Sequence, residues 1–306
     1  MHHKGYFVWW SLSWALIFFN PALGQENIYI PDSTIDNKNS YTSYKKLLLY
    51  SHKEDLSDPR SDHKHNIFIS YYHLKAPSDT VFKYMRQAID FDPVTECDLI
   101  FKGDYPFIKI CSRFYCPEKM EKVKNLCDSV YSSFDSTLID ILSIIKESDQ
   151  KYRADQKYSP WIKGNESYWE EQAIIDSINI LLVNKILLRH GYPGRQKVGR
   201  ELEDVAFMVI QHADIKNQEK HLYIIKNAVE QRQLYKSAYP LLVDRIRMKK
   251  HLPQIYGTQL VHNKKRDRLE LYKMESLEGI DELRAKYGLS TLRSYLERTG
   301  AFMPEN

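Results

Sequence analysis

Hydrophobic side chains recur three or four residues apart through most of the chain, which is the spacing of one face of an α-helix. In the first half this spacing is clearest at 81–89 and 138–145. Residues 168–189 hold so many hydrophobic positions that we expect a helix buried on most of its sides. Further helical stretches follow at 201–213, 218–229, 237–250, 281–287 and 290–298. No stretch alternates in the manner of a strand for more than about five residues, so the pattern predicts an all-α protein.

The first 24 residues have the pattern of a secretory signal peptide. Lys4 precedes an uncharged, mostly hydrophobic run at 6–19, and small residues lead up to Gly24. A run of about 14 residues is too short for a membrane-spanning helix, which needs roughly 20. We therefore expect cleavage after Gly24 and a mature protein that is periplasmic or secreted, in contact with a membrane only during export.

Composition divides the mature chain into three parts. Residues 25–65 are polar and rich in Asn, Asp, Ser and Pro, so we expect a loosely held lead-in with one helix near 44–52. Residues 66–137 predict a small array of helices that resembles a helical repeat. Residues 138–306 predict a second helical domain, a bundle.

Within the array, residues 65–93 resemble one tetratricopeptide unit, a helix–turn–helix module of about 34 residues. Tyr72, Ala88 and Pro93 stand where that family has its tyrosine, its packing alanine and its closing proline, whereas Ile69 and Val81 replace two of its small residues. The resemblance implies a pair of helices stacked on neighbouring helices, with a peptide or protein as one option for a partner.

Four cysteines lie close together in the array: Cys97, Cys111, Cys116 and Cys127. In an exported protein an even, clustered set indicates one or two disulfides, and the sequence leaves all three pairings open. A zinc site is the alternative, but the gaps between the four residues do not match the closely paired thiolates of structural zinc sites. We therefore predict disulfides here.

Charge and composition exclude several classes of function. The 44 Lys and Arg residues exceed the 40 Asp and Glu residues by a formal charge of only +4, too small a surplus to indicate a nucleic-acid partner. Glycine is scarce, at 11 residues, which weakens the case for a phosphate-binding glycine-rich loop. The sequence contains no nucleophile elbow, His-Glu-x-x-His motif or Walker loop. Neither a cofactor nor a metal is predicted.

Several polar residues interrupt the hydrophobic helices of the second half. Asp176 and Asn179 lie on one side of the most hydrophobic helix, where an unpaired carboxylate would cost several kcal/mol. His212 ends a hydrophobic run, at a helix C-terminus whose dipole favours a cationic imidazole. Other polar groups of this kind are Asp149, Arg153, Asp214, Asp244, Arg245, Gln254, Tyr256 and Gln259.

One hypothesis gathers these groups into a single site. His212 would act as general acid or base, and Asp214 or Asp244 would orient it, so that all three are candidate catalytic residues. The same three residues form a weak ligand set for a metal. Side chains expected to bind a small anionic substrate are Arg153, Asp176, Asn179, Arg245, Gln254, Tyr256 and Gln259.

The alternative hypothesis gives these residues a structural role. Asp176 would pair with Arg153 or Arg245 inside the bundle, and His212 would cap its helix, because structural ion-pair networks imitate active sites. The two hypotheses belong to different classes of function. The first predicts an exported protein that hydrolyses or binds a small ligand, and the second a non-catalytic envelope module that binds other proteins.

The order of the glycines and polar residues in the second half also resembles a known family. The matching residues are 191–194, 198–199, 211–214, 218, 244–245, 254 and 256–259, together with Asp149, Gln150, Arg153, Asp176 and Asn179. They are similar to the bacterial family catalogued as domain of unknown function 6624, roughly over residues 138–295. Lys273 and Ser276 depart from that family's usual Pro-Ile-Glu-Asp turn. Since the family's activity is not established, the resemblance implies a shared pocket and no reaction.

Overall fold

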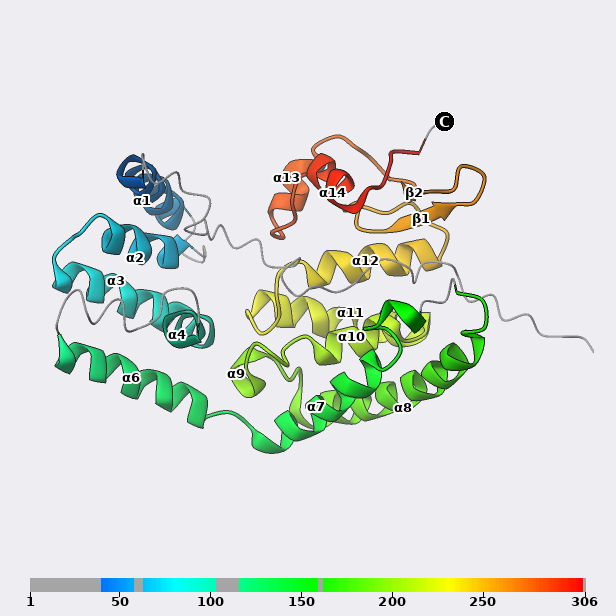
Figure 1. The fold of residues 1–306 in the computed structure, drawn as a ribbon, viewed down its shortest axis with the longest axis horizontal. Helices are drawn as coiled ribbons and strands as arrows, with labels where there is room; N and C mark the ends of the chain where they lie inside the picture. The colour runs from blue at the N-terminus through cyan, green and yellow to red at the C-terminus, as the bar shows by residue number, and fades with distance from the viewer. Residues whose placement is uncertain (1–39, 58–62, 103–115, 159–161, 305–306) are drawn as a thin grey trace, which may run out of the picture. The chain divides into compact units, whose positions relative to one another are not determined.

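The computed structural model describes residues 40–57, 63–102, 116–158 and 162–304 (Figure 1). The expected signal peptide, much of the lead-in and Cys111 lie outside these ranges. The described chain is mostly helical and divides into two compact units. We name them the N-terminal unit, which includes residues 27–139 and 194–202, and the C-terminal unit, which includes residues 140–193 and 203–306. The prediction of an all-α fold is confirmed.

The N-terminal unit is a series of helices in which each contacts the next along the chain (Figure 1). They are α1 (Ser40–Ser57), α2 (His63–His73), α3 (Ser78–Phe91), α4 (Pro93–Lys102) and α6 (Pro117–Ser132). Prolines open α4 and α6, where the missing N–H costs nothing and the fixed φ suits a first turn. The helix–turn–helix expected at 65–93 is present as α2 and α3, while its kinship with tetratricopeptide units stays a prediction.

A hydrophobic core holds these helices together, and a disulfide links two of them. Val81, Met85 and Ile89 of α3 are fully buried, as their spacing predicted. Cys97 of α4 and Cys127 of α6 form a disulfide inside this core. The prediction of a disulfide is therefore confirmed for one pairing that the sequence left open.

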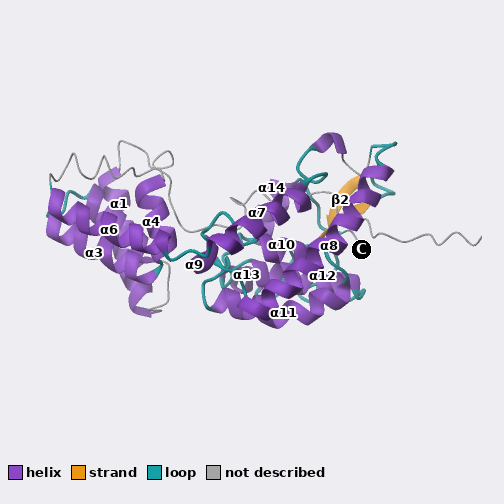
Figure 2. Ribbon diagram, turned by 90° about the horizontal axis from the view of Figure 1, so that it is seen from below, coloured by secondary structure: helices purple, strands orange, loops and turns teal. Residues whose placement is uncertain are grey.

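The C-terminal unit packs its helices around one that is almost wholly buried (Figures 1 and 2). Its elements are α7 (Ser136–Gln150), which enters from the N-terminal unit, η3 (Gln156–Tyr158), α8 (Glu166–His190), α10 (Val205–His212), α11 (Ile215–Glu230), α12 (Ala238–Lys249), α13 (Ile280–Ala285) and α14 (Leu292–Thr299). The short α9 (Arg195–Val198) belongs to the N-terminal unit. Every residue of α10 except His212 is buried, and the helix contacts α8, α11 and α12. This helix therefore fixes the position of His212.

Two features of the C-terminal unit differ from the expectations. A two-stranded antiparallel hairpin pairs β1 (Leu260–Asn263) with β2 (Arg268–Leu271), and strands of this length give no clear alternating signal. The second difference concerns α8. Its inner face is buried, but a row of large hydrophobic residues on another face is exposed, so the expectation of burial on most sides is wrong. None of the helices in the described ranges combines the length and hydrophobicity needed to cross a membrane.

Candidate functional site

The centre of the candidate site is a pair formed by His212 and Asp149. His212 is the last residue of α10, and Asp149 lies in the last turn of α7. The imidazole Nδ1 is 2.9 Å from Asp149 Oδ1, and the Gln150 side-chain amide donates to the other carboxylate oxygen at 2.7 Å. The Asp149 side chain is only 1% exposed, whereas that of His212 keeps 11% of its surface accessible. A carboxylate in this position fixes the orientation and the tautomer of an imidazole.

Burial and neighbouring charges set the protonation states of this pair. Burial lowers the pKa of His212; Asp149 opposes this shift and the positive charge of Arg153 adds to it. Burial by itself would raise the pKa of Asp149, but the attraction of His212 and Arg153 outweighs it and lowers the pKa below its ordinary value. At neutral pH the imidazole is therefore neutral and donates its Nδ1–H to an ionised carboxylate. Burial thus opposes the cationic form that the position of His212 at the C-terminus of α10 favours.

Arg153 connects this pair to Asp176 of α8. Its two terminal nitrogens reach the two oxygens of Asp176 at 2.9 and 2.5 Å, a bidentate ion pair. The same guanidinium donates to the backbone carbonyl of Asp149 at 2.6 Å and lies 3.5 Å from its carboxylate. Gln172 donates to Asp176 at 3.0 Å. His212, Asp149, Arg153 and Asp176 thus form one continuous network, which includes the Asp176–Arg153 pairing of the structural hypothesis.

Arg245 of α12 differs from every other charged group of this region. The residue is only 5% exposed, and its Nε is buried with no hydrogen-bond partner among the described residues. Burial lowers its pKa to about 10, an effect that Tyr295 opposes and Arg153 strengthens. A buried guanidinium without a counter-charge is costly, by several kcal/mol in typical cases. The arrangement is therefore suited to a ligand that brings a negative charge.

Lys249 lies one turn after Arg245, on the same face of α12. Burial and the repulsion of Arg245 lower its pKa to about 8, whereas Asp214 opposes the shift. Its ammonium donates at 3.0 Å to the carbonyl of Ala213, the residue that follows His212. Lys249 therefore brings a second cation to the side of α12 that faces the end of α10.

Asp244 precedes Arg245 in the sequence, but its side chain has a structural role. It is fully buried, and its carboxylate accepts hydrogen bonds from the backbone N–H groups of Ile255, Tyr256 and Thr258 at 2.7 to 3.1 Å, as well as from the Thr258 hydroxyl at 2.9 Å. Burial raises its pKa, and these hydrogen bonds oppose the rise. Asp244 therefore holds the turn at 254–259.

Arg284 holds the same turn from its carbonyl side. It is 1% exposed and donates to the carbonyl oxygens of Tyr256 at 2.6 Å, Gly257 at 3.0 Å and Ser290 at 2.6 Å. Gly257 has φ +67°, and a Cβ there would lie 3.0 Å from Leu292 Cδ1, so the turn requires glycine. We call Asp244, Arg284 and residues 254–259 the clamped turn.

The polar side chains of the clamped turn are used within it. The Gln254 amide group accepts from the Gln259 N–H at 2.8 Å and donates to the carbonyls of Gln259 and Tyr272. Gln259 donates to Thr258 Oγ1 at 3.1 Å, and the ring of Tyr256 packs edge-on against Tyr287. The sequence is rich in hydrogen-bonding residues here because these side chains bond to one another and to the backbone of the turn. None of these bonds requires a ligand.

Of the residues expected to meet, the structure joins His212, Arg153 and Asp176, with Asn179 beside them through Ser148. Asn179 Nδ2 is buried and has no hydrogen-bond partner among the described residues. Asp214 instead caps α11, where it accepts from the Asn217 N–H at 2.8 Å. The carboxylate that orients His212 is Asp149, and neither Asp214 nor Asp244 does so.

Sequence reasoning left out two residues of this region as members of the site. Asp149 was named among the polar groups of the second half without a role in the site, and Lys249 was not singled out. Lys249 follows a usable signal, because it lies four residues after Arg245 on α12 and so shares a helix face with it, whereas Arg153 lies beyond the end of α7 and shares no helix with Asp149. No three metal-binding side chains of the described ranges are grouped so as to hold an ion.

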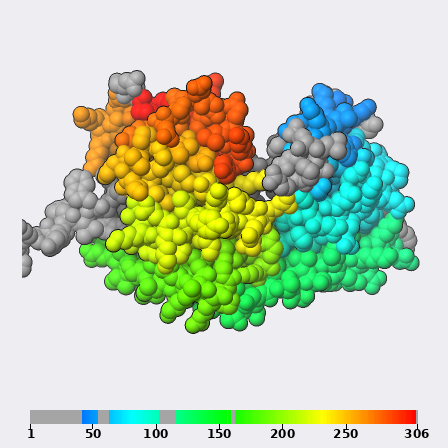
Figure 3. All heavy atoms as spheres, turned by 180° about the vertical axis from the view of Figure 1, so that it is seen from behind, coloured from blue at the N-terminus to red at the C-terminus, as the bar shows by residue number. Residues whose placement is uncertain are grey.

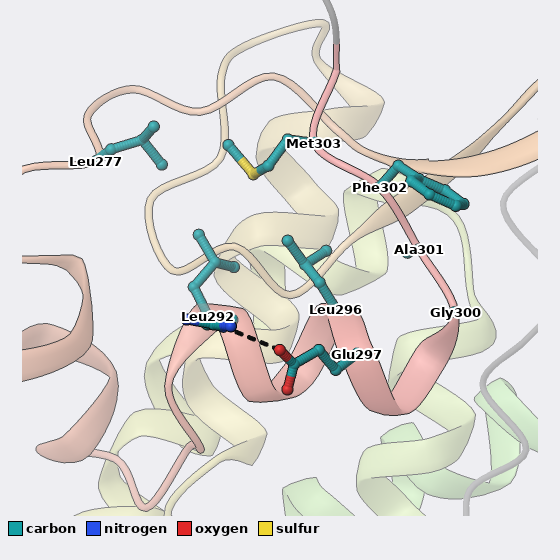
Figure 4. Close-up of a pocket in the computed structure, with 9 residues that line it drawn as sticks. Leu277, Leu292, Leu296, Glu297, Gly300, Ala301, Phe302 and Met303 are labelled. Atoms are coloured by element: carbon teal, nitrogen blue, oxygen red, sulfur yellow. Dashed lines mark hydrogen bonds and ion pairs between the residues drawn. The ribbon is translucent and has the colours of Figure 1, made fainter.

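A hydrophobic groove of about 490 Å³ lies elsewhere in the C-terminal unit (Figure 4). Its walls come from α14, from the segment after it and from Leu277, which precedes α13, and they include Leu292, Leu296, Phe302 and Met303. Figure 4 shows Leu277 and Met303 on one side of the groove and Leu292 and Leu296 of α14 below. None of the predicted site residues lines this groove.

Comparison with family models matches residues 137–301, more than half of the 306 residues, to the Family of unknown function (DUF6624). The chain belongs to this family. The DUF6624 region contains the His212–Asp149 pair, the Arg153–Asp176 pair, Arg245 and the clamped turn, whereas α1 to α6 precede it. No curated protein and no solved structure matches the chain.

Proposed function

We propose that the DUF6624 region binds a small organic anion at Arg245, next to the His212–Asp149 pair. One observation carries the proposal: Arg245 is buried, and its Nε has no hydrogen-bond partner in the described part of the chain. Proteins bury a charge at a net cost unless a partner compensates it. A carboxylate or phosphate group is the partner that a planar guanidinium with several parallel donors binds best.

The neighbouring groups support hydrolysis of the bound anion. A neutral imidazole whose Nδ1–H is held by a carboxylate is the form that takes a proton at Nε2. His212 would accept a proton from the water molecule as the water oxygen bonds to the reacting centre of an ester, and Asp149 would stabilise the imidazolium that results. The ester bond would then break, and the imidazolium would return the proton to the leaving alcohol. Arg245 and Lys249 would hold the negative group of the substrate. Arg153 would keep Asp149 ionised while being neutralised by Asp176.

We also propose that the mature protein is periplasmic or secreted. The pattern of residues 1–24 supports export, and the Cys97–Cys127 disulfide is typical of oxidising compartments. Expression of the full chain in a Gram-negative host, followed by fractionation and intact-mass analysis, tests this. We expect a soluble periplasmic or culture-medium product that begins at Gln25. A cytoplasmic product that retains residues 1–24 would contradict export.

The binding proposal is tested with three proteins: the wild type, Arg245→Met, and Arg189→Met as a control that removes an exposed arginine from the same unit. Each is analysed by native mass spectrometry for a co-purifying anion and by thermal unfolding with acetate, inorganic phosphate and a phosphate monoester. At about 100 times Kd, a ligand stabilises a protein by about 2.7 kcal/mol. We expect this response from the wild type and from Arg189→Met only.

Equal stabilisation of the wild type and Arg245→Met by the anion would contradict the proposal. His212→Gln then separates hydrolysis from binding. If the site is hydrolytic, this variant retains the anion and loses turnover of the ester that the wild type cleaves. If the wild type cleaves nothing that it binds, the function is binding alone.

A further inference from the structure

The exposed row on α8 has the geometry of a helix-pairing surface. We define the α8 stripe as Ile174, Ile178, Leu181 and Leu188, whose exposed fractions are 63%, 53%, 62% and 87%. At 100° per residue these positions fall within a narrow band along about 21 Å of the helix. Lys185 completes a spacing of four, three, four and three residues, which is the repeat of a coiled-coil seam.

The stripe has no role in the core of its own unit. The packing of α8 uses other positions, because Val183, Ile186 and Leu187 are the buried ones. In the ribbon view α8 lies at the outer edge of the C-terminal unit, and in the space-filling view the green atoms of this part of the chain form the unit's lower rim (Figures 1 and 3). Monomeric proteins rarely expose such a continuous hydrophobic row without a partner.

The charges along α8 indicate which partner fits. Glu166 and Glu170 lie in its N-terminal part, and Lys185 and Arg189 in its C-terminal part, all four exposed. A second α8 in the parallel direction would place like charges side by side. In the antiparallel direction the acidic end of one α8 lies beside the basic end of the other, so both ends of the contact are complementary. An antiparallel copy of the same helix therefore matches both the stripe and the charges at its ends.

We propose that two copies of this chain associate through their α8 stripes, antiparallel and about a two-fold axis. Such an interface is isologous, so each copy contributes the same four hydrophobic residues. The contact involves one helix per copy and is small compared with permanent interfaces. The dimer is therefore weak and depends on protein concentration. It involves neither Arg245 nor His212 and is independent of anion binding.

Sedimentation velocity of the full mature chain, from about 10 to about 200 µM, measures this association. The disrupting variant is Leu181→Glu. Its matched control is Leu49→Glu, which changes an equally exposed leucine on α1, 65% against 62%. We expect dimerisation of the wild type and of Leu49→Glu, and at least about a tenfold weaker association of Leu181→Glu. Thermal unfolding of both variants checks that they fold, since exposed positions rarely alter stability by much.

Charge reversal tests the direction of pairing. Glu170→Lys alone weakens the dimer, because it puts a positive charge at the acidic end of α8, next to the basic end of the other copy. Adding Lys185→Glu and Arg189→Glu to the same chain restores association. A wild type that stays monomeric up to the highest concentration overturns the proposal, as does an equal effect of Leu181→Glu and Leu49→Glu. Failure of the combined reversal to restore association overturns the antiparallel direction.

Discussion

Two buried arginines of the C-terminal unit have opposite surroundings. Arg284, in the clamped turn, is 1% exposed and donates to three backbone carbonyls. Arg245 is almost as buried, yet its Nε has no hydrogen-bond partner within the described residues. Since burial costs both side chains a similar desolvation energy, only Arg284 recovers it within the fold. Arg284 therefore stabilises the fold, whereas the desolvation energy of Arg245 has to be compensated by a ligand.

Two adjacent residues of α12 show the same contrast between a buried charge that is satisfied and one that is not. Asp244 and Arg245 follow one another on α12, and both are buried. The carboxylate of Asp244 is satisfied by the N–H groups and the hydroxyl of the clamped turn, whereas Arg245 lies close enough to Arg153 for repulsion to contribute to its lowered pKa. Because consecutive residues of a helix point about 100° apart, α12 can direct Asp244 towards the clamped turn and Arg245 towards a different region.

The largest expected effect concerns the clamped turn. Asp244→Ala removes the acceptor of three backbone N–H groups, two of them buried, and a buried group left unpaired costs about 1 to 3 kcal/mol. Urea denaturation should show a loss of about 3 to 5 kcal/mol in the free energy of unfolding. The control is Asp214→Ala, which removes the cap of α11 and costs about 1 kcal/mol. Similar losses for the two variants would mean that Asp244 is no more structural than a helix cap.

A smaller effect concerns pH. The pKa of His212 in the folded protein lies below its ordinary value of 6.5, so protonation favours the unfolded chain. Its contribution to stability is unchanged above about pH 7 and falls as the pH drops below 6.5, by at most about 1.4 kcal/mol per pH unit. Asp149, whose pKa lies below 3.8, adds stability that is lost only under more acidic conditions.

Asp204 acts in the opposite direction, because burial raises its pKa to about 6 and its contribution to stability grows as the pH falls from 6 to 4. Comparison of the wild type with His212→Gln cancels this background, since both retain Asp204. Denaturation at pH 8, 6.5 and 5 should show the wild type losing stability relative to the variant. Parallel profiles would show that His212 is not buried in its neutral form.

Much of the fold could be predicted because helical spacing is a local signal. The expected helix at 168–189 is α8, with its end at Gly191. The count of hydrophobic residues misjudged the burial of α8, because it does not reveal which faces meet a neighbour. Residues 254–259 were assigned to a ligand because their side chains can form many hydrogen bonds, but those bonds are made within the clamped turn.

The site could be predicted only in part, because its contacts join distant segments. His212 and its carboxylate Asp149 are 63 residues apart, and no local pattern distinguishes Asp149 from Asp214 or Asp244 as the partner. Likewise, nothing near residue 244 in the sequence reveals that Asp244 is satisfied and Arg245 is not. These distinctions depend on which elements pack together.

The contrast between the two arginines is tested most directly by measuring stability and anion binding together in Arg245→Met and Arg284→Met. We expect Arg245→Met to be as stable as the wild type or about 1 to 3 kcal/mol more stable in urea, with no calorimetric binding of the anion that the wild type binds. We expect Arg284→Met to lose about 3 kcal/mol and to retain binding wherever it is folded. An Arg245→Met protein that is destabilised as much as Arg284→Met, and still binds the anion, would contradict the account.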